Sequence, residues 1–385
     1  MQPNAFRNMR LWCAAALAAA CLTASVCPAS PPPVEIAAVV PLTGQAKAFG
    51  EAAIKGARVA EAEINAGGGV MGRRLELVPI DNRSTPLTAK QAAETAVKRG
   101  VMGVVGAIWS THSLAVAPVL QKAGIPMISP GSTAPEVTRV GDFIFRTCYT
   151  DDFQGKLMAN FASQSLKGRR AAVFININET YSQILARYFM DAFVKNEGAM
   201  ITQASYKSTA VDFKAILAPL LSAPPDVVFI PGYTRDSGLL IRQANGMGIR
   251  TTFLGGDAWE AAISLIAGEA ALEGSYFSTH WHPQVPYPKS RQFIARYAAA
   301  YGEEDISPFS ALAYDALWLF AEAARAAASV DPQKVRNALA GITGFEGATG
   351  AIIFDANGDP LRKGASIMKY NGGRWVFYKA FTPRD

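Results

Sequence analysis

Cysteine is scarce in this 385-residue sequence, and its placement excludes a disulfide-stabilised fold. Three of the four cysteines, Cys13, Cys21 and Cys27, lie in or beside an apolar segment near the N-terminus. Only Cys148 remains in the rest of the chain, so no internal disulfide can form there. Packing has to stabilise the core, and a chain of this length with 50% hydrophobic residues is long enough for two domains.

Runs of basic residues are also missing. The formal net charge is +6, but lysines and arginines never extend beyond pairs such as Arg73 with Arg74 and Arg169 with Arg170. Because a nucleic-acid backbone is bound by a continuous basic surface, we expect no nucleic-acid partner. The modest positive charge affects solubility and encounter rates rather than the fold.

Few residues carry catalytic or metal-binding chemistry. The chain has three histidines, and although His280 and His282 would share one face of a strand, no spaced cysteine or carboxylate completes a metal site. The motifs of serine hydrolases and zinc proteases are absent, and His112 has no identifiable orienting acid. The glycines of residues 67–72 fit a dinucleotide pattern, but they follow a helix and precede a strand, the reverse of such a site. We therefore expect no cofactor, no metal and no enzymatic activity.

A long hydrophobic run occurs only near the N-terminus. Two arginines precede the apolar residues 11–26, and small residues follow them up to Ser30. The run is too short and too rich in alanine to favour a membrane anchor, so residues 1–29 are predicted to be a secretory signal peptide. We expect a periplasmic protein that begins near Ser30. Lipidation of Cys21 is the alternative, which the alanine three places before it disfavours.

Beyond this segment, short apolar strands alternate with segments of helical period. Residues 34–40 predict a buried strand, and the apolar residues of 51–65 recur on one face of a helix. Similar pairs follow along the chain. Continuous apolar strands that alternate with helices indicate parallel sheets covered by helices on both faces. The predicted fold class is therefore α/β, with two doubly wound parallel-sheet lobes.

The segment after the strand predicted at residues 252–254 is too long to be an appendage. We expect it to return to the first lobe and then to the second, which gives three crossover segments between the lobes. The first lobe would contain residues 34–146 and 276–350. The second lobe would contain residues 147–275 and 351–385.

Short polar residues follow two neighbouring strands of the predicted first sheet. Parallel strands end at one edge of a sheet, so helix N-termini that follow them present unpaired N–H groups and partial positive charge to one crevice. Ordinary capping explains each segment by itself, with Thr133 as the cap of a short helix, but the pair together suits a carboxylate. A glycine at this edge also lets a ligand approach the main chain. The candidates are Ser110, Gly131, Ser132 and Thr133.

Tyrosines and an acid follow strands of the predicted second sheet. Tyr181, Tyr233 and Asp257 each come shortly after a strand end. A single tyrosine is more often a core or surface residue, but all three share this position. Asp257 would accept hydrogen bonds from an ammonium group, and the tyrosines would supply oxygens and an aromatic face. The two edges together predict a site for an amino acid.

Three segments carry a resemblance to a known family. Residues 41–81, 124–136 and 145–155 resemble type I periplasmic substrate-binding proteins of the leucine/isoleucine/valine-binding group, which serve ABC importers. The resemblance covers almost everything after the signal peptide. It implies two lobes that close on a small-molecule ligand, a membrane permease as partner, and a monomer.

The resemblance also implies roles for individual residues. Ser110, Gly131 and Thr133 match the positions that hold the ligand carboxylate. Tyr181, Tyr233 and Asp257 match those around its ammonium group. The positions near the side-chain pocket are Phe49, Ile108, Trp109 and Phe309.

Two departures from the family leave the size of the ligand open. Trp109 and Ser84 occupy the positions of a disulfide in the branched-chain binder, and Asp257 is one methylene shorter than the glutamate found there. A tryptophan wall either shrinks the pocket for a small amino acid or stacks against an aromatic one.

The leading hypothesis is a binding protein that delivers an aliphatic or aromatic amino acid to an ABC transporter permease. Two alternatives keep the fold: a binding protein for an aromatic carboxylate or amide, and a ligand-sensing component of a receptor. The first of these leaves Asp257 without an ammonium group to meet. An enzyme is disfavoured by the absence of a catalytic set.

Overall fold

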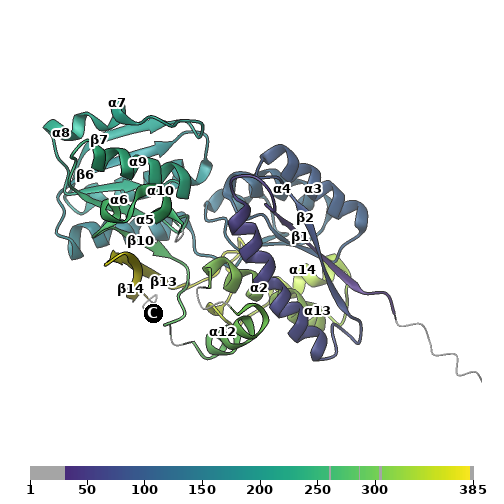
Figure 1. The fold of residues 1–385 in the computed structure, drawn as a ribbon. Helices are drawn as coiled ribbons and strands as arrows, with labels where there is room; N and C mark the ends of the chain where they lie inside the picture. The colour runs from purple at the N-terminus through teal and green to yellow at the C-terminus, as the bar shows by residue number, and fades with distance from the viewer. Residues whose placement is uncertain (1–30, 260–261, 286, 303–305, 382–385) are drawn as a thin grey trace, which may run out of the picture. The chain divides into compact units, whose positions relative to one another are not determined.

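The computed structural model describes residues 31–259, 262–285, 287–302 and 306–381. The predicted signal peptide and its three cysteines lie outside these residues. The chain from residue 33 onward forms one compact unit built around two larger sheets and a short hairpin (Figure 1). None of the described helices is long and apolar enough to cross a membrane.

The first sheet has five parallel strands in the order β2-β1-β3-β4-β5. This order places β3 and β4 side by side, as the prediction of a shared crevice requires. The strands are β1 (Val34–Val40), β2 (Leu75–Asp81), β3 (Gly103–Gly106), β4 (Met127–Ser129) and β5 (Ile144–Arg146).

Helices cover both faces of this sheet because β1 is apolar on both sides. Ile36, Ala38 and Val40 pack in one cluster with α2 and α13, while Ala37 and Val39 pack in another with α3 and α4. Figure 1 shows α2 on one side of β1 and β2, and α3 and α4 on the other. These helices are α2 (Lys47–Ala66), α3 (Pro86–Arg99), α4 (Ser110–Ala123) and α13 (Pro308–Ala326), and a 3-10 helix, η1 (Pro135–Val140), follows β4.

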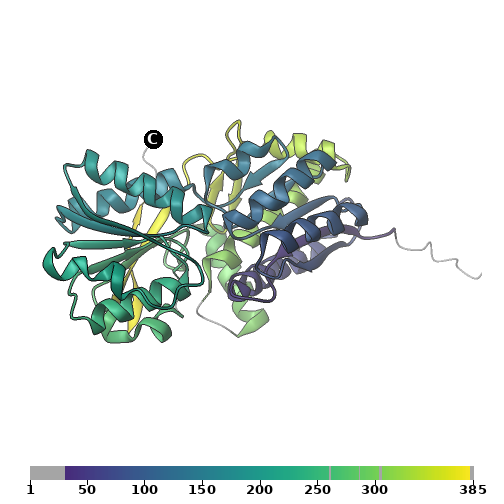
Figure 2. The ribbon, with the colours of Figure 1, turned by 90° about the horizontal axis from the view of Figure 1, so that it is seen from above.

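The second sheet has seven strands in the order β14-β13-β10-β9-β8-β6-β7. The strands from β10 to β7 are parallel, whereas β13 pairs antiparallel with both β10 and β14. Figure 2 shows the last two strands, in yellow, continuing the teal part of the sheet. The strands are β6 (Arg170–Asn176), β7 (Ala199–Tyr206), β8 (Val227–Ile230), β9 (Thr252–Gly255), β10 (Tyr276–Thr279), β13 (Ala365–Asn371) and β14 (Arg374–Phe381).

Two helical layers cover the second sheet in the same way. Ala171 and Val173 pack with α5, η2 and α6, whereas Ala172 and Phe174 pack with the helices from α7 to α11. Two short helices, α7 and α8, follow β7, with Pro219 starting the second. The helices are α5 (Asp151–Asn160), the π-helix η2 (Phe161–Ser165), α6 (Thr180–Lys195), α7 (Lys214–Leu217), α8 (Pro219–Ser222), α9 (Thr234–Gly246), α10 (Ile263–Ala267) and α11 (Glu269–Leu272).

The chain passes between the two sheets three times, as predicted. It leaves the first sheet after β5, returns to the first lobe's helices after β10, and enters the second sheet again at β13. The predicted boundary at Tyr276 is displaced, because β10 pairs with β9 in the second sheet and the crossing follows Thr279. The returning elements are α12 (Pro288–Tyr301), α13, α14 (Pro332–Ala340) and the hairpin β11 (Phe345–Gly347) and β12 (Gly350–Ile352).

Candidate functional site

The loops that follow β3 and β4 meet those that follow β8 and β9 around one small cavity. Its volume is about 220 Å³. Nine of the eleven predicted site residues line it, and Ser132 and Thr133 do not. The lining consists of Phe49, Ile108, Trp109, Ser110, Gly131, Tyr181, Tyr233, Asp257, Ala258 and Phe309.

The first lobe contributes neutral donors, and several of its hydroxyl groups are already bonded within the protein. Helix α4 begins directly at Ser110, whose Oγ accepts a hydrogen bond from the Ala134 N–H at 3.2 Å. Ser132 was predicted to face the ligand, but its Oγ lies 2.7 Å from Ser113 Oγ and donates to the Ile108 carbonyl at 3.0 Å. Ser132 therefore ties the two loops together beneath the cavity.

Thr133 does not cap a helix, contrary to the prediction. The residue before η1 is Ala134, and no side chain caps that helix. Thr133 is fully buried, and its Oγ1 makes no well-aligned hydrogen bond within the described part of the chain, although it lies close enough to Asp151 to lower the pKa of that carboxyl. Because a buried hydroxyl without a partner costs about 1–3 kcal/mol, a polar ligand atom at this position would offset that cost.

Gly131 has a packing reason beside the predicted functional one. A Cβ at this position would lie 2.8 Å from Cε1 of Phe309 and 3.0 Å from Cγ2 of Ile108. Any larger residue would have to displace these two cavity walls. The glycine therefore allows the aromatic wall to close over the loop.

A buried arginine holds the same loop from behind. Nη1 of Arg146 donates to the Ser132 carbonyl at 2.6 Å, and Nη2 donates to the Ala134 carbonyl at 3.0 Å. Its Nε forms an ion pair with Oδ1 of Asp359 at 2.6 Å. Since both loop carbonyls bond to the guanidinium, their positions are fixed before any ligand arrives.

The second lobe contributes a buried acid with a dense hydrogen-bond network. Oδ1 of Asp257 accepts hydrogen bonds from Gln154 Nε2 at 2.8 Å and from the Tyr181 hydroxyl at 3.0 Å. Its Oδ2 lies 3.0 Å from Nε2 of His280. Asp257 is 4% exposed, so these contacts hold a carboxylate that is nearly removed from water.

A second acid lies behind Asp257. Asp151 is fully buried, and neither of its carboxyl oxygens has a hydrogen-bond partner among the residues described. Burial and the nearby charge of Asp257 raise the pKa of the Asp151 carboxyl well above its usual range. Burial likewise raises the pKa of Tyr181 and of Tyr233, so both phenols stay neutral donors. The neutral forms of these groups are therefore favoured, and Asp257 is the acid on this side of the cavity that is held by hydrogen bonds as a carboxylate.

Four aromatic rings form a continuous stack, which we call the aromatic column. His112 stacks on Trp109 at 5.4 Å, Trp109 on Tyr233 at 3.6 Å, and Tyr233 on Tyr181 at 5.5 Å, between ring centroids. The interplanar angles are 21°, 14° and 29°. The column joins the first lobe to the second.

A hydrogen bond between the lobes lies beside the aromatic column. Thr111 Oγ1 donates to Glu179 Oε2 at 2.9 Å and accepts from the Thr180 N–H at 3.2 Å. Burial raises the pKa of Glu179 to about 7. Burial also lowers the pKa of His112 to about 4, which keeps this ring of the column neutral near pH 7.

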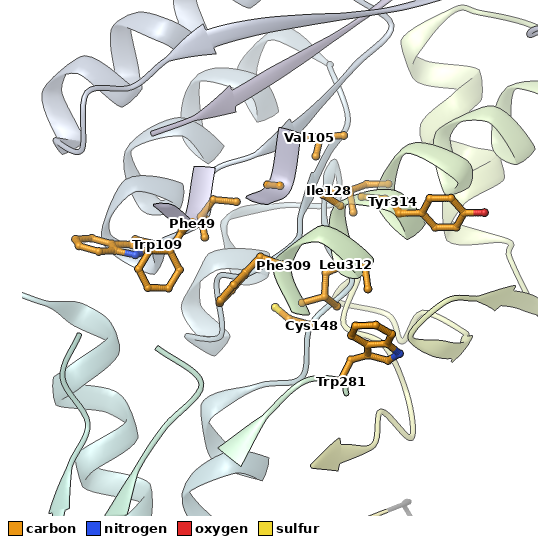
Figure 3. Packing of buried hydrophobic residues seen from close by; sticks show 14 of the residues in the cluster. Phe49, Val105, Trp109, Ile128, Cys148, Trp281, Phe309, Leu312 and Tyr314 are labelled. Atoms are coloured by element: carbon orange, nitrogen blue, oxygen red, sulfur yellow. The ribbon is translucent and has the colours of Figure 1, made fainter. Parts of the chain in front are cut away.

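Phe49 completes the apolar wall. Its ring makes edge contacts with Trp109 at 5.9 Å, Tyr233 at 6.4 Å and Phe309 at 5.2 Å. Figure 3 shows Phe49 and Trp109 close together, with Phe309 next to them on α13. The wall is a packed cluster of rings rather than an open slot.

The sequence profile of the family described as "Periplasmic binding protein" matches residues 33–374. The chain belongs to this family. A leucine-, isoleucine-, valine-, threonine- and alanine-binding protein of Pseudomonas aeruginosa is 32% identical over 331 residues, which are 85% of this chain and 87% of that protein.

Solved structures of periplasmic binding proteins share the fold. A leucine-binding protein of Thermotoga maritima has a TM-score of 0.85 and 34% identity, over 91% of this chain and 99% of that one. A branched-chain amino acid transporter substrate-binding protein of Streptococcus pneumoniae, solved with isoleucine, has a TM-score of 0.85 and 31% identity, over 91% and 100%. The type I periplasmic binding protein fold and the leucine/isoleucine/valine-binding resemblance are thereby confirmed.

This periplasmic binding protein uses residues that the sequence analysis did not assign to the site. Gln154, Asp151 and Arg146 all lie in the segment that carried the family resemblance, which was the available signal for them. His280 was considered only with His282 as a metal ligand, but β10 ends before both residues. His282 stacks on Phe377 at 5.1 Å instead. Within the described ranges, no group of three histidine, cysteine or acidic side chains is placed to hold a metal ion.

Proposed function

We propose that this periplasmic binding protein captures an amino acid in the cavity and delivers it, chemically unchanged, to an ABC transporter permease. The observation that carries the proposal is the opposite character of the two cavity walls. Neutral donors come from one lobe and a buried acid from the other, 4% exposed and held by three contacts. A small zwitterion matches this arrangement.

The first lobe suits the carboxylate end. Ser110 lines the cavity at the first turn of the 14-residue helix α4, where backbone N–H groups lack partners and the helix dipole favours an anion. Thr133, one loop away, has a hydroxyl that makes no other hydrogen bond with the described residues. These donors need no charge of their own.

The second lobe suits the ammonium end. Asp257 lines the cavity together with the phenols of Tyr181 and Tyr233. An ammonium beside this carboxylate would gain charge-assisted hydrogen bonds that are stronger than neutral ones. The names of the relatives, which bind leucine, isoleucine, valine, threonine or alanine, agree with an amino acid ligand.

Export and solution state are part of the same proposal. Membership of the periplasmic binding protein family implies a location outside the cytoplasm. The arginine-preceded apolar segment at residues 11–26 would direct that export as a cleaved signal peptide. We propose that the mature protein is a monomer, as the clamp of two lobes within one chain needs no second copy.

A ligand screen tests the proposal. Melting temperatures of the purified protein would be measured with amino acids and with the matching acids that lack the amine, such as alanine with propionate and leucine with 4-methylpentanoate. Ligand binding stabilises the native state by RT ln(1 + [L]/Kd), so the amino acids should raise the melting temperature and the amine-free acids should not. An amine-free or aromatic acid that binds more tightly than every amino acid would overturn the proposal in favour of a carboxylate-binding protein.

A further inference from the structure

We infer that Trp109 restricts the ligand to amino acids with small side chains, such as glycine, alanine or serine, and excludes leucine and phenylalanine. The inference rests on the proposed function, since it assumes an amino acid held between Ser110 and Asp257. The inference concerns the apolar wall of the cavity, which would face the side chain of an amino acid whose carboxylate and ammonium groups are held by the two lobes. This wall consists of Phe49, Ile108, Trp109 and Phe309.

The size of the cavity supports a small ligand. The space open to a water-sized sphere is only about 10 Å³, so even a small amino acid requires the surrounding side chains to move, and each added methylene requires a larger movement. Trp109 is 4% exposed and contributes the largest side chain of the lining. Its indole therefore fills space that a smaller residue would leave to the ligand.

The stacking of Trp109 excludes the role of a platform for an aromatic ligand. The indole stacks on Tyr233 at 3.6 Å and on His112 at 5.4 Å between ring centroids, and its side chain is buried. Tyr233 in turn stacks on Tyr181 at 5.5 Å. An aromatic side chain would have to separate these rings before it could stack on Trp109. The aromatic column therefore favours a pocket that Trp109 shrinks for a small amino acid over one in which Trp109 stacks on an aromatic ligand.

The neighbouring large groove does not offer the side chain a way out. A groove of about 1730 Å³ shares only Asp257 and Phe309 with the cavity. Phe309 is 2% exposed and packs against Phe49 at 5.2 Å and His280 at 5.9 Å. A cavity ligand reaches this groove only if the Phe309 ring moves.

The opposite side is closed by the aromatic column. A shallow groove there, lined by Glu179, Arg235 and their neighbours, shares Phe49, Trp109 and Tyr233 with the cavity. Any side chain that extends in this direction meets Trp109 or Tyr233. Trp109 lines both the cavity and this groove and is the largest side chain of the cavity lining, so its removal should enlarge the cavity on this side.

Calorimetry with a graded series of amino acids tests the inference. The wild-type protein would be titrated with glycine, alanine, valine, leucine and phenylalanine, alongside Trp109→Ala and Trp109→Phe. Because one methylene in an apolar pocket is worth about 10–200-fold in discrimination, we expect alanine to bind the wild type at least about 10-fold more tightly than leucine. Trp109→Ala should bind leucine more tightly than alanine, and the ratio of the two affinities in Trp109→Phe should lie between those of Trp109→Ala and the wild type.

Trp318→Ala is the matched control, because Trp318 lines the outer grooves beside α13 and not the cavity. The ratio of its affinities for alanine and leucine should equal that of the wild-type protein. Circular dichroism would show whether Trp109→Ala folds. If it does not, Trp109→Phe keeps a ring in the aromatic column, and its affinity for leucine relative to alanine should still be higher than that of the wild-type protein.

The outcomes separate this inference from the proposed function. A wild-type protein that binds leucine more tightly than alanine, or a ratio that neither Trp109 variant changes, would overturn the size restriction while leaving an amino acid ligand in place. Binding of amine-free acids with no response to any amino acid would overturn the proposed function itself.

Discussion

The two edges that face the cavity differ in how their polar groups are satisfied. On the first-lobe edge, Ser110 and Ser132 already bond to neighbouring loops, and the remaining donors are neutral. On the second-lobe edge, Asp257 is buried with three partners, and Asp151 lies behind it with none in the described chain. The first edge leaves only the Thr133 hydroxyl without a well-aligned partner among the described residues, whereas the second concentrates acidic groups whose ionised forms are costly to bury. Recognition of a zwitterion therefore depends more on the acid than on the hydroxyls.

Replacing Asp257 should have the largest effect on ligand binding, because it removes the charge that distinguishes the second-lobe edge from the first. Asp257→Asn keeps the shape but loses the charge, and truncating one partner of a buried charged pair costs about 2–5 kcal/mol. Calorimetry should therefore show a loss of amino acid affinity of that size. The melting temperature of the free protein should also fall, because the amide nitrogen replaces one of the two carboxylate oxygens and cannot accept the hydrogen bonds made there. Asp142→Asn, an exposed acid paired with Arg336 at 2.8 Å, is the control that should leave affinity unchanged.

Two variants that remove a hydroxyl group, Thr133→Val and Ser110→Ala, test the first-lobe edge. Thr133→Val should weaken ligand binding by about 1.5–3 kcal/mol, because it removes a hydrogen bond to a charged group. It should lower the melting temperature of the free protein only slightly, since Thr133 Oγ1 makes no well-aligned hydrogen bond among the described residues and loses only its contact with the Asp151 carboxyl. Ser110→Ala should instead destabilise the free protein by about 1 kcal/mol, because the Ala134 N–H loses its acceptor. Equal melting temperatures for both variants would contradict the assignment.

A change of pH tests the contact between the lobes and has the smallest expected effect. Burial raises the pKa of Glu179 to about 7, so in the closed form this group is protonated at pH values where an exposed glutamate is ionised. If opening exposes Glu179, closure is favoured at low pH and weakens as the pH rises through about 7. The full shift corresponds to no more than about 3 kcal/mol, and residual exposure reduces it to about 1 kcal/mol.

Small-angle scattering of the ligand-free protein at pH 5.5 and pH 8.5 measures this effect. The radius of gyration should be larger at the higher pH, and Glu179→Gln should remove the difference. Glu94→Gln, an exposed acid on α3, should keep it. A radius that is the same at both pH values in the wild type would show that Glu179 does not contribute to closure.

The sequence predicted which residues reach the cavity better than it predicted what each one bonds to. Strand ends are readable because apolar runs stop abruptly, so Ser110, Tyr233 and Asp257 were found. The direction of a short side chain is not encoded in that pattern, and Ser132 turned toward Ser113 instead of the cavity. Thr133 failed as a cap because Ala134 occupies the residue before η1.

The buried network was missed for a different reason. Gln154, Asp257 and His280 come from elements far apart in the chain and meet only through the pairing of the second sheet and the packing of α5. Local periodicity carries no information about such long-range partners. The lobe boundary was predicted at Tyr276 but follows Thr279 for the same reason. The four residues of β10 belong to the second sheet because of the strands they pair with, which local sequence does not show.

The pairing of Arg146 with Asp359 makes the cavity dependent on the end of the chain. All eleven predicted site residues have been synthesised once residue 309 is added, yet the counter-ion of the guanidinium behind their loop, Asp359, has not. A buried charge that loses its partner costs about 3–5 kcal/mol, so a truncated protein would carry every recognition residue on an unsupported loop. Competence to bind is thereby tied to synthesis of the chain through Asp359, and a protein cut short before Asp359 would bind ligand more weakly than the intact chain.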